Sequence, residues 1–427
     1  MINKCINFTK KIIKNKELRN ATLFTLLCLF VFRIGSNIVI SSVDVSSINQ
    51  IGGFEIFNLL TGADMTGFTI FALGLSPFIT GSIVVELLSN DVIPAFTRWK
   101  KENDTHKRNV ASNTIGLVTA FLQATSITLA LDNTYGIMRA GNIYSYIYTI
   151  AIMVAGSCFL LWMSKQIDSY GIGNGSSLII AAGILYKMPS MIDVAYNIVV
   201  TYKDWTTFVS FGLLMLAFLS VVFFVVFIEK SERRIPIVFS QGKNSVLHQK
   251  SLNEYLPIKV NASGVIPVIF ASSILQIPSM LAMLTGKNPN WINYFSFSHP
   301  IGIGIYALMI VFFVFYYSHT LINAKNIDKN FKQSRCNING VRPGEETEKY
   351  INKVLNRVCS IGAIALLFIA LIPILLPMFW NTAYIAGLTV GGTSLIIVTS
   401  VTLEIYNKFK SQMTRKEYTA QSMFWKK

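Results

Sequence analysis

Residues 74–83 read Gly74-Leu75-Ser76-Pro77-Phe78-Ile79-Thr80-Gly81-Ser82-Ile83, and residues 264–273 read Gly264-Val265-Ile266-Pro267-Val268-Ile269-Phe270-Ala271-Ser272-Ser273. Gly, Pro, Ile and Ser recur in register, and both stretches lie inside long apolar segments. Such self-similarity indicates that the chain consists of two homologous halves. Because proline removes a backbone hydrogen bond of a helix, each half is predicted to contribute one proline-bent helix to a shared central structure.

The composition is that of a membrane protein. Of the 427 residues, 52% are hydrophobic and only 14% are charged, whereas about 25% of the residues of a soluble domain are charged. A helix needs about 20 apolar residues to cross about 30 Å of hydrocarbon. Ten stretches approach this length, and we predict spans at Ala21–Ile40, Phe71–Leu88, Ala111–Leu131, Tyr144–Ser164, Gly175–Tyr196, Thr207–Ile228, Gly264–Leu284, Ile303–Leu321, Cys359–Phe379 and Ile385–Ile405.

The basic residues indicate how these spans are oriented. Lys and Arg number 37 against 21 Asp and Glu, an excess that also occurs in nucleic-acid-binding proteins. Here, however, alternate connections are nearly free of them, and those predicted to be external hold only Arg139, Lys203 and Lys287. Under the positive-inside rule, the other connections and both termini lie in the cytosol.

Five spans are predicted in each half of the chain. The repeated element falls in span two of the first half, residues 21–196, and in span seven of the second half, residues 207–406. An odd number of spans separates equivalent positions, so the halves insert with opposite orientation. The other predicted segments are a basic amphipathic helix at 1–20, basic cytosolic connections at 229–263 and 322–358, and a cytosolic tail at 407–427.

The external connection after span one contains a short apolar segment bounded by glycines, Gly52-Gly53-Phe54-Glu55-Ile56-Phe57-Asn58-Leu59-Leu60-Thr61-Gly62. A helix over this segment reaches only about 14 Å and cannot cross the bilayer. Its apolar side chains favour packing against the protein. Two interpretations stay open: a helix lying on the external surface, or a re-entrant plug in the outer mouth of a channel.

Ionisable residues are scarce inside the predicted spans. Solute carriers differ in this respect, because they place such residues at their substrate sites. Arg33 lies in span one, where it either lines a water-filled cavity or pairs within the bundle. The repeated element instead puts Ile79 and Ile269 near the middle of the membrane. Apolar side chains at a constriction exclude water and block ions. The alternative is that both isoleucines are ordinary packing residues.

No catalytic or cofactor motif is recognisable. The loop Gly171-Ile172-Gly173-Asn174-Gly175 is rich in glycine, but no strand precedes it and a predicted span follows, so we expect no nucleotide binding there. The four histidines show no metal-ligand spacing, and no nucleophile and base stand together. We therefore expect a protein that is not an enzyme and has no cofactor, and any energy for directed transport has to come from a partner.

Six motifs follow one another along the chain. They are Phe71-Ala72-Leu73-Gly74-Leu75-Ser76-Pro77-Phe78-Ile79, Gly171-Ile172-Gly173-Asn174-Gly175, Glu232-Arg233-Arg234-Ile235-Pro236, Gly264-Val265-Ile266-Pro267, Val341-Arg342-Pro343-Gly344-Glu345 and Gly391-Gly392-Thr393-Ser394. In order and spacing they resemble the SecY family of protein-conducting channels. The resemblance implies an all-α polytopic membrane protein, in which ten transmembrane helices form a clamshell of two inverted five-helix halves around a central pore with a re-entrant plug helix.

The resemblance also implies roles for individual residues. A hydrophobic pore ring is implied at Leu75, Ile79, Ile180, Ile269 and Ile397. The plug is implied at about 53–65, with Gly53, Phe54, Ile56, Phe57, Leu59 and Leu60. A lateral gate between spans two and three on one side and seven and eight on the other has Thr80, Gln123, Ser272 and Gln276 along it. Partner docking is implied at Arg342, Pro343, Gly344, Arg233, Arg234, Lys243 and Lys250.

Two positions depart from the family pattern. Ser176 stands near the ring where the family commonly has an apolar residue, which puts the tightness of the seal in doubt. The tip of the connection 229–263, from Gln241 to His248, is less basic than the family pattern. Arg342 is therefore the stronger candidate for docking.

The implied function is translocation of unfolded secretory proteins across the bacterial plasma membrane and insertion of membrane proteins into it; a plastid membrane stays open as the location. The implied partners are the small membrane subunits SecE and SecG, the motor ATPase SecA, the ribosome, signal sequences, preprotein chains and membrane lipids. An inverted-repeat secondary transporter for a small solute is the main alternative, because that class shares inverted repeats and broken helices.

Overall fold

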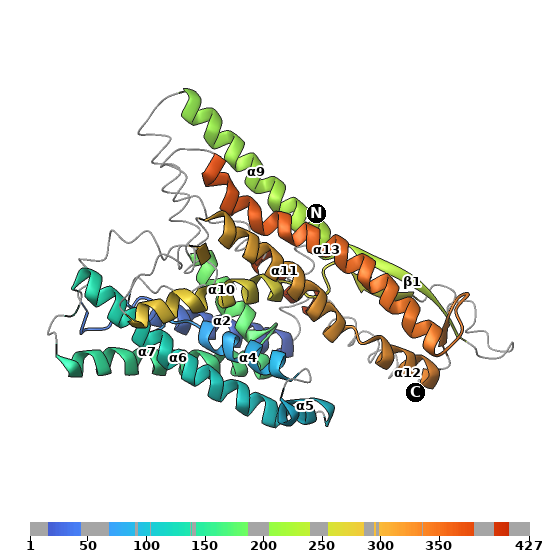
Figure 1. Cartoon of the computed structure of the whole chain (residues 1–427), viewed down its shortest axis with the longest axis horizontal. Helices are drawn as coiled ribbons and strands as arrows, with labels where there is room; N and C mark the ends of the chain where they lie inside the picture. Colours follow the sequence, from blue (N-terminus) through green and yellow to red (C-terminus); the bar gives the residue numbers. More distant parts are fainter. Residues whose placement is uncertain are drawn as a thin grey trace. The chain divides into compact units, whose positions relative to one another are not determined.

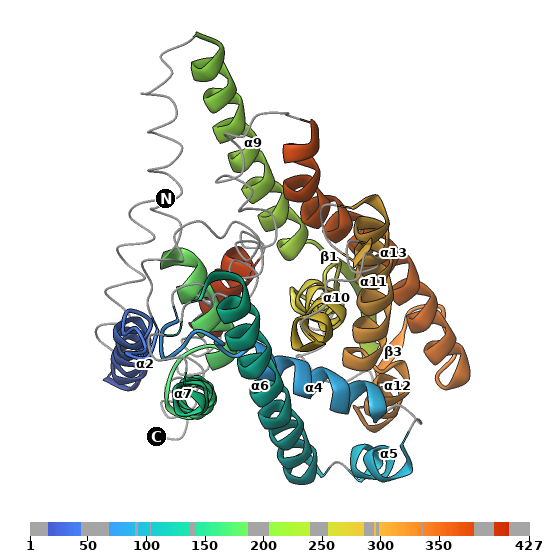
Figure 2. The same cartoon turned by 60° about the vertical axis from the view of Figure 1, so that its left-hand side comes forward.

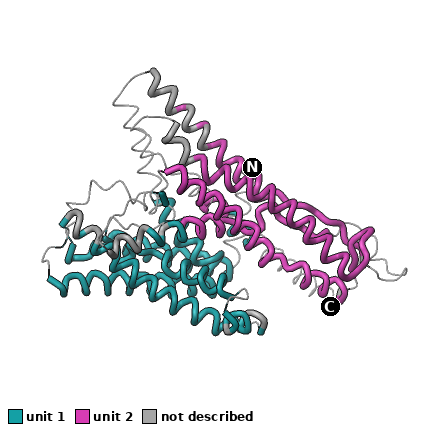
Figure 3. The backbone as a smooth tube through the Cα atoms, viewed as in Figure 1, with its two compact units in different colours: residues 1–196, 273–295, 401–427 teal, residues 197–272, 296–400 magenta. Residues whose placement is uncertain are grey.

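The computed structural model describes residues 16–43, 68–89, 93–102, 104–136, 138, 142–186, 205–239, 255–285, 294–295, 299–334, 336–379 and 397–409. The chain divides into two compact units (Figure 3). The first unit comprises residues 1–196, 273–295 and 401–427, and the second comprises 197–272 and 296–400. Two helices therefore begin in the second unit and end in the first: α10 (Ile266–Thr285) and the last helix, residues 397–409.

The first unit is built from long helices. They are α2 (Lys16–Gly35), α4 (Ser76–Leu88), α5 (Pro94–Lys101), α6 (Thr105–Tyr135), α7 (Ile143–Tyr170) and the shorter helix Gly175–Tyr186. The Asp104 side chain caps the start of α6 by accepting the N–H of Lys107 at 3.1 Å. Gly136, which has a φ of 61°, caps the other end of the helix. In Figure 1, α6 packs against both α4 and α7.

The second unit combines helices with a small sheet. Its elements are α9 (Trp205–Lys230), β1 (Glu232–Phe239), β2 (Tyr255–Lys259), the start of α10, α11 (Pro300–Leu321), α12 (Ala324–Ser334), β3 (Cys336–Ile338) and α13 (Glu345–Phe379). Helices α11 and α13 pack side by side (Figure 2). Ile235, Ile258 and Ile338 of the three strands are buried against Ile351 and Leu355 of α13.

The sheet was not anticipated, because the resemblance implied an all-α protein and no strand was predicted in the connections 229–263 and 322–358. Its order is β2-β1-β3, and both pairs are antiparallel. Residues 232–236 of β1 pair with β2, and residues 237–239 pair with β3. Pro236 stands where β1 changes partner. The ladder with β2 ends at Pro236, and the ladder with β3 begins at Ile237. The N–H that the proline lacks therefore interrupts neither ladder.

Five helices in the described part of the chain are long and apolar enough to cross a membrane. Four of them are in α2, α6, α7 and α13, and the fifth begins with α11. Apolar side chains are exposed on these helices; on α2 the exposed ones include Leu23, Leu26, Leu27 and Phe30. An exposed apolar surface of this extent is unfavourable in water and suits contact with lipid.

The structure corrects the expectation that the repeated prolines bend their helices. Pro77 is the second residue of α4 and Pro267 the second residue of α10. The first turn of a helix tolerates proline because its N–H groups have no partner within the helix. The repeated element therefore starts a helix, and α4 is shorter than the predicted span Phe71–Leu88. Span one ends earlier than predicted, because α2 runs from Lys16 to Gly35 and the predicted span ran from Ala21 to Ile40.

Candidate functional site

The two copies of the repeated element fold into the same turn. Gly74 and Gly264 both have left-handed backbones, with φ of 58° and 64°. The next residue supplies the carbonyl that starts the helix. The oxygen of Leu75 accepts the N–H groups of Phe78 and Ile79, each at 3.1 Å. In the other copy the oxygen of Val265 accepts those of Val268 and Ile269, at 3.1 and 3.3 Å.

The non-helical segment that leads into α4 is enclosed by protein. Every residue from Phe71 to Phe78 is buried. The Phe71 ring is stacked between Phe32 of α2 and Phe159 of α7, with ring centroids 6.1 and 5.9 Å away. Non-helical backbone at membrane depth is tolerated only inside protein or beside water, because lipid offers no hydrogen bonds. The first copy of the repeated element meets this requirement within its own unit.

The residues assigned to the pore ring are divided between the two units. Leu75 and Ile180 are buried within the first unit, where Ile79 is half-buried. Ile269 is half-buried and Ile397 is buried in the second unit. A ring formed by all five residues stays a prediction.

The residues predicted to line the gate on α4 and α6, Thr80 and Gln123, are both hydrogen-bonded to Ser76. Ser76 donates to Oε1 of the buried Gln123 at 3.4 Å, and its carbonyl oxygen accepts the hydroxyl of Thr80 at 3.0 Å. On α10, the Ser272 hydroxyl donates to the carbonyl oxygen of Ile269 at 2.8 Å. The side chain of Gln276 lies outside the described residues.

Close packing joins α4 and α6 into one element, a feature that the sequence reasoning missed. A Cβ placed on Gly81 would lie 2.5 Å from the backbone nitrogen of Gly116. The hydroxyls of Ser112 and Ser82 are hydrogen-bonded at 2.8 Å, and Thr119 donates to the carbonyl oxygen of Pro77 at 2.9 Å. The spacing of four between Ser112 and Gly116 is typical of helix contacts in membranes and could have revealed this pair.

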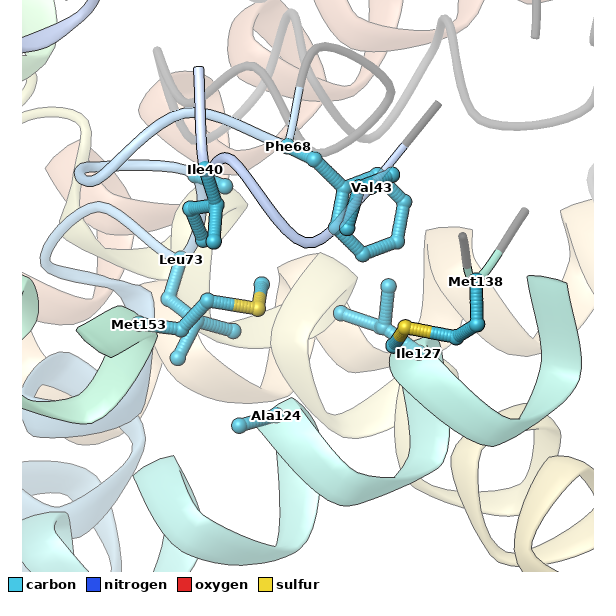
Figure 4. Close-up of a cluster of buried hydrophobic side chains, with 9 residues drawn as sticks. Ile40, Val43, Phe68, Leu73, Ala124, Ile127, Met138 and Met153 are labelled. Carbon is cyan, nitrogen blue, oxygen red and sulfur yellow. The ribbon is translucent and has the colours of Figure 1, made fainter. Parts of the chain in front are cut away.

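The predicted plug, residues 53–65, lies outside the described residues, but the segments on either side of it are tied together. Val39 and Thr69 form an isolated antiparallel bridge, and the N–H of Ile40 donates to the oxygen of Phe68 at 2.9 Å. Phe68 is fully buried and has a φ of 42°. Figure 4 shows the cluster around it, formed by Ile40, Val43, Phe68, Leu73, Ala124, Ile127, Met138 and Met153.

Arg33 has an aromatic partner inside the first unit. Its guanidinium carbon lies 3.0 Å from the centre of the Tyr186 ring. A cation over an aromatic face is stabilised by the ring quadrupole, most strongly where water is partly excluded. Of the two interpretations left open for Arg33, this contact favours pairing within the bundle.

Arg342 and Pro343, which are predicted docking residues, lie on a well-supported loop of the second unit. Both are exposed, whereas the loop backbone is held from two sides. The buried Asp328 of α12 accepts the N–H of Gly344 at 3.0 Å and pairs with Lys332 at 2.7 Å. The Thr347 hydroxyl of α13 donates to the carbonyl oxygen of Arg342 at 2.9 Å. Gly344 has a φ of 117°, a conformation that favours glycine.

The other predicted docking residues are on β1 or outside the described residues. Arg233 and Arg234 are exposed on β1. Arg234 pairs with Glu232 at 2.8 Å and lies over the Tyr255 ring at 4.7 Å, and the hydrogen bond with Glu232 raises the pKa of Arg234. Lys243 and Lys250 lie outside the described residues. Among the residues that are described, no cluster of three His, Cys, Asp or Glu side chains could hold a metal ion.

Comparison with known proteins gives one consistent result. The profile of the SecY family matches residues 69–406. The protein translocase subunit SecY of Bacillus licheniformis is 35% identical over 417 residues, covering 94% of this chain and 96% of that protein. The subunit of the same name from Bacillus subtilis is 35% identical over 415 residues, with the same coverage.

Solved structures show the same fold at lower identity. A structure described as that of a protein conducting channel matches with a TM-score of 0.65 at 17% identity, over 94% of each chain. A structure described as showing that the SecY plug domain stabilises the closed channel matches with a TM-score of 0.66 at 16% identity, also over 94% of each. Sec61 in a canine ribosome-channel complex matches with a TM-score of 0.60 at 16% identity, over 94% of each. The chain belongs to the SecY family.

Proposed function

We propose that this chain is the channel-forming subunit of a protein translocase, which moves unfolded secretory proteins across a membrane and inserts membrane proteins into it. The observation that carries the proposal is membership of the SecY family along nearly the whole chain. The paired turns at Gly74 and Gly264 support it, because they give each half an apolar helix start. Such a protein is a conduit and not an enzyme.

The proposed seal has two layers. Leu75, Ile79, Ile180, Ile269 and Ile397 form an apolar constriction, which water and ions avoid because they cannot keep their hydration there. The segment 53–65 forms the plug beside it. The tie between Ile40 and Phe68 supports this assignment, because it joins the described residues that precede and follow the plug segment.

The proposed lateral gate opens along the α4–α6 pair. A signal sequence that leaves the channel through this gate enters lipid, where about 20 apolar residues gain a few tenths of a kcal/mol per Leu or Ile. Thr80 and Gln123 lie on the flank formed by this pair, and Ser272 and Gln276 lie on α10. The contact between Gly81 and Gly116 supports movement of α4 and α6 as one body.

The proposed docking site is the loop that carries Arg342, together with Arg233 and Arg234 of β1 and Lys243 and Lys250. The motor ATPase SecA and the ribosome are the proposed partners on the cytosolic side, with SecE and SecG in the membrane. Two features support this site: Arg342 is exposed, and its loop is held by Asp328 and Thr347. The proposed location is the bacterial plasma membrane with both termini in the cytosol.

Reconstitution separates this function from small-solute transport. The chain is assembled with the small membrane subunits in vesicles and supplied with SecA, ATP and a labelled preprotein. We expect the preprotein to become protected from external protease, and we expect no uptake of labelled amino acids or sugars driven by an ion gradient. Gradient-driven solute uptake without preprotein protection would support the secondary transporter instead.

A further inference from the structure

The glycine loop between α7 and the helix Gly175–Tyr186 is held by three other parts of the first unit. The Thr25 hydroxyl of α2 accepts the N–H of Ile172 at 3.0 Å. The Asp168 carboxylate of α7 accepts the N–H of Gly175 at 2.7 Å. Lys408 of the last helix donates from its ammonium group to the carbonyl oxygen of Gly173 at 2.8 Å. The N–H groups of Ile172 and Gly175 are thus hydrogen-bonded to side chains of the protein itself.

Steric constraints explain why glycines stand in this loop, without any bound ligand. Gly173 has a φ of 97°, a backbone conformation that residues with a side chain rarely adopt. A Cβ placed on Gly175 would overlap the carbonyl oxygen of Ser164 on α7. The motif therefore allows a tight turn pressed against α7, and it leaves the Gly173 oxygen turned toward Lys408.

An apolar cluster lies beside the lysine. Leu18, Ile172 and Phe409 are buried together, with Ala21 and Ile405 packed against them. These residues come from the start of α2, from the glycine loop and from the last helix. Partial exclusion of water strengthens a hydrogen bond from a charged donor, and such bonds contribute about twice as much as neutral ones. Packing and hydrogen bonding thus hold the same helix end.

We propose that the loop 171–174 is a clasp for the cytosolic end of the last helix and that Lys408 is its positioning residue. The same helix carries Ile397 about three turns earlier. The clasp fixes the helix at one end, and the placement of Ile397 in the apolar constriction follows from it. The placement of Ile397 in the constriction rests on the proposed function, whereas the clasp itself does not.

The test replaces Lys408 with methionine, which keeps the length of the side chain but removes its donors. Lys408→Arg restores a charged donor, and Asn407→Ala changes the exposed neighbour on the same helix. Hydrogen exchange is measured on the assembled channel for residues 402–409. We expect about tenfold faster exchange in Lys408→Met, as the loss of one charged hydrogen bond implies. Lys408→Arg and Asn407→Ala are expected to match the parent protein.

Resting ion conductance in planar bilayers tests whether the clasp places Ile397 in the constriction. Lys408→Met is expected to raise it, and Lys408→Arg to restore the parent value. Unchanged exchange in Lys408→Met overturns the clasp. Faster exchange with unchanged conductance overturns the positioning of Ile397, while the proposed function is judged separately on variants of Ile79 and Ile269.

A second variant keeps the inference testable if Lys408→Met does not assemble. Thr25→Val removes the acceptor of the Ile172 N–H and leaves Lys408 in place. We expect faster exchange both at Ile172 and in residues 402–409, because the loop and the helix end hold one another. An effect confined to Ile172 would contradict the clasp.

Discussion

Ile79 and Ile269 occupy the same position in two turns of the same geometry. Each N–H donates to the carbonyl of the residue four positions earlier, Leu75 or Val265, and each side chain is half-buried within its own unit. Each isoleucine follows a left-handed glycine by five residues. Half-burial leaves part of each side chain exposed, as a lining residue of a passage requires.

The first prediction concerns this pair. Replacing both Ile79 and Ile269 with asparagine should wet the constriction, because an amide binds water that an isoleucine repels. We expect a clearly raised resting ion conductance in planar bilayers. Ile277→Asn, an exposed position of α10, is the matched control and should leave the conductance at the parent value. Equal conductance in the double variant and the control would remove both residues from the seal.

The contact between α4 and α6 gives a prediction about stability. A Cβ on Gly81 would meet backbone atoms of Gly116 and Ser112 at 2.5 to 2.8 Å, and backbone atoms give way less readily than the end of a side chain. Gly81→Ala should therefore destabilise the protein by about 1–3 kcal/mol. The measurement is thermal unfolding of the assembled complex in detergent.

The control for this prediction is Gly304→Ala on α11. A Cβ there meets nothing within 4 Å, and alanine favours a helix over glycine by up to about 1 kcal/mol. We expect unchanged or slightly higher stability. If both variants unfold at the same temperature, the α4–α6 pair is not as closely packed as described.

Arg342 gives a prediction about docking. Arg342→Glu reverses the charge of an exposed side chain on a loop that Asp328 and Thr347 keep in place. We expect binding of SecA to be weakened by about tenfold or more, as reversal of an interface charge implies, with the channel still assembled. Lys353→Glu makes the same change at an exposed position of α13 and should bind normally. Equal binding by the two variants would exclude Arg342 from the docking site.

The cap of α6 gives a prediction about pH. The backbone N–H of Lys107, and next its ammonium group, lower the pKa of Asp104. The stabilisation of the helix start is thus complete above the ordinary aspartate pKa of about 3.9 and is lost as the pH falls through the lower pKa of the folded state. Exchange of the Lys107 amide, corrected for its intrinsic pH dependence, should speed up below about pH 4. Asp104→Ala should abolish this dependence, and its persistence would contradict the cap.

Much of the fold could be predicted from local patterns. The repeated element predicted two equivalent proline-containing helices, and apolar length predicted the helices that include α6, α7, α11 and α13. The sheet was missed because its pairs are not local: β1 meets β2 and β3 only after long intervening segments, and no alternation marks Glu232–Phe239 as a strand. Proline was misread as a bend because sequence alone does not say where a helix begins.

The candidate site was predictable in its residue types and less so in its contacts. The resemblance implied Arg342 as a docking residue, and the structure leaves its side chain exposed. The bond from Gly344 to Asp328 and the bond between Lys408 and Gly173 join residues distant in sequence, so no spacing rule could reveal them. Arg33 left two interpretations open for the same reason, since its partner Tyr186 lies far along the chain.

Cross-linking from an arrested preprotein tests the central claim most directly. Single cysteines replace Ile79, Ile269 and, as a control, the exposed Leu219 of α9. The preprotein carries a cross-linker in the segment held within the channel. The account predicts cross-links at positions 79 and 269 and none at 219. Cross-links at neither 79 nor 269, with the preprotein demonstrably arrested, would contradict a passage lined by the two repeated turns.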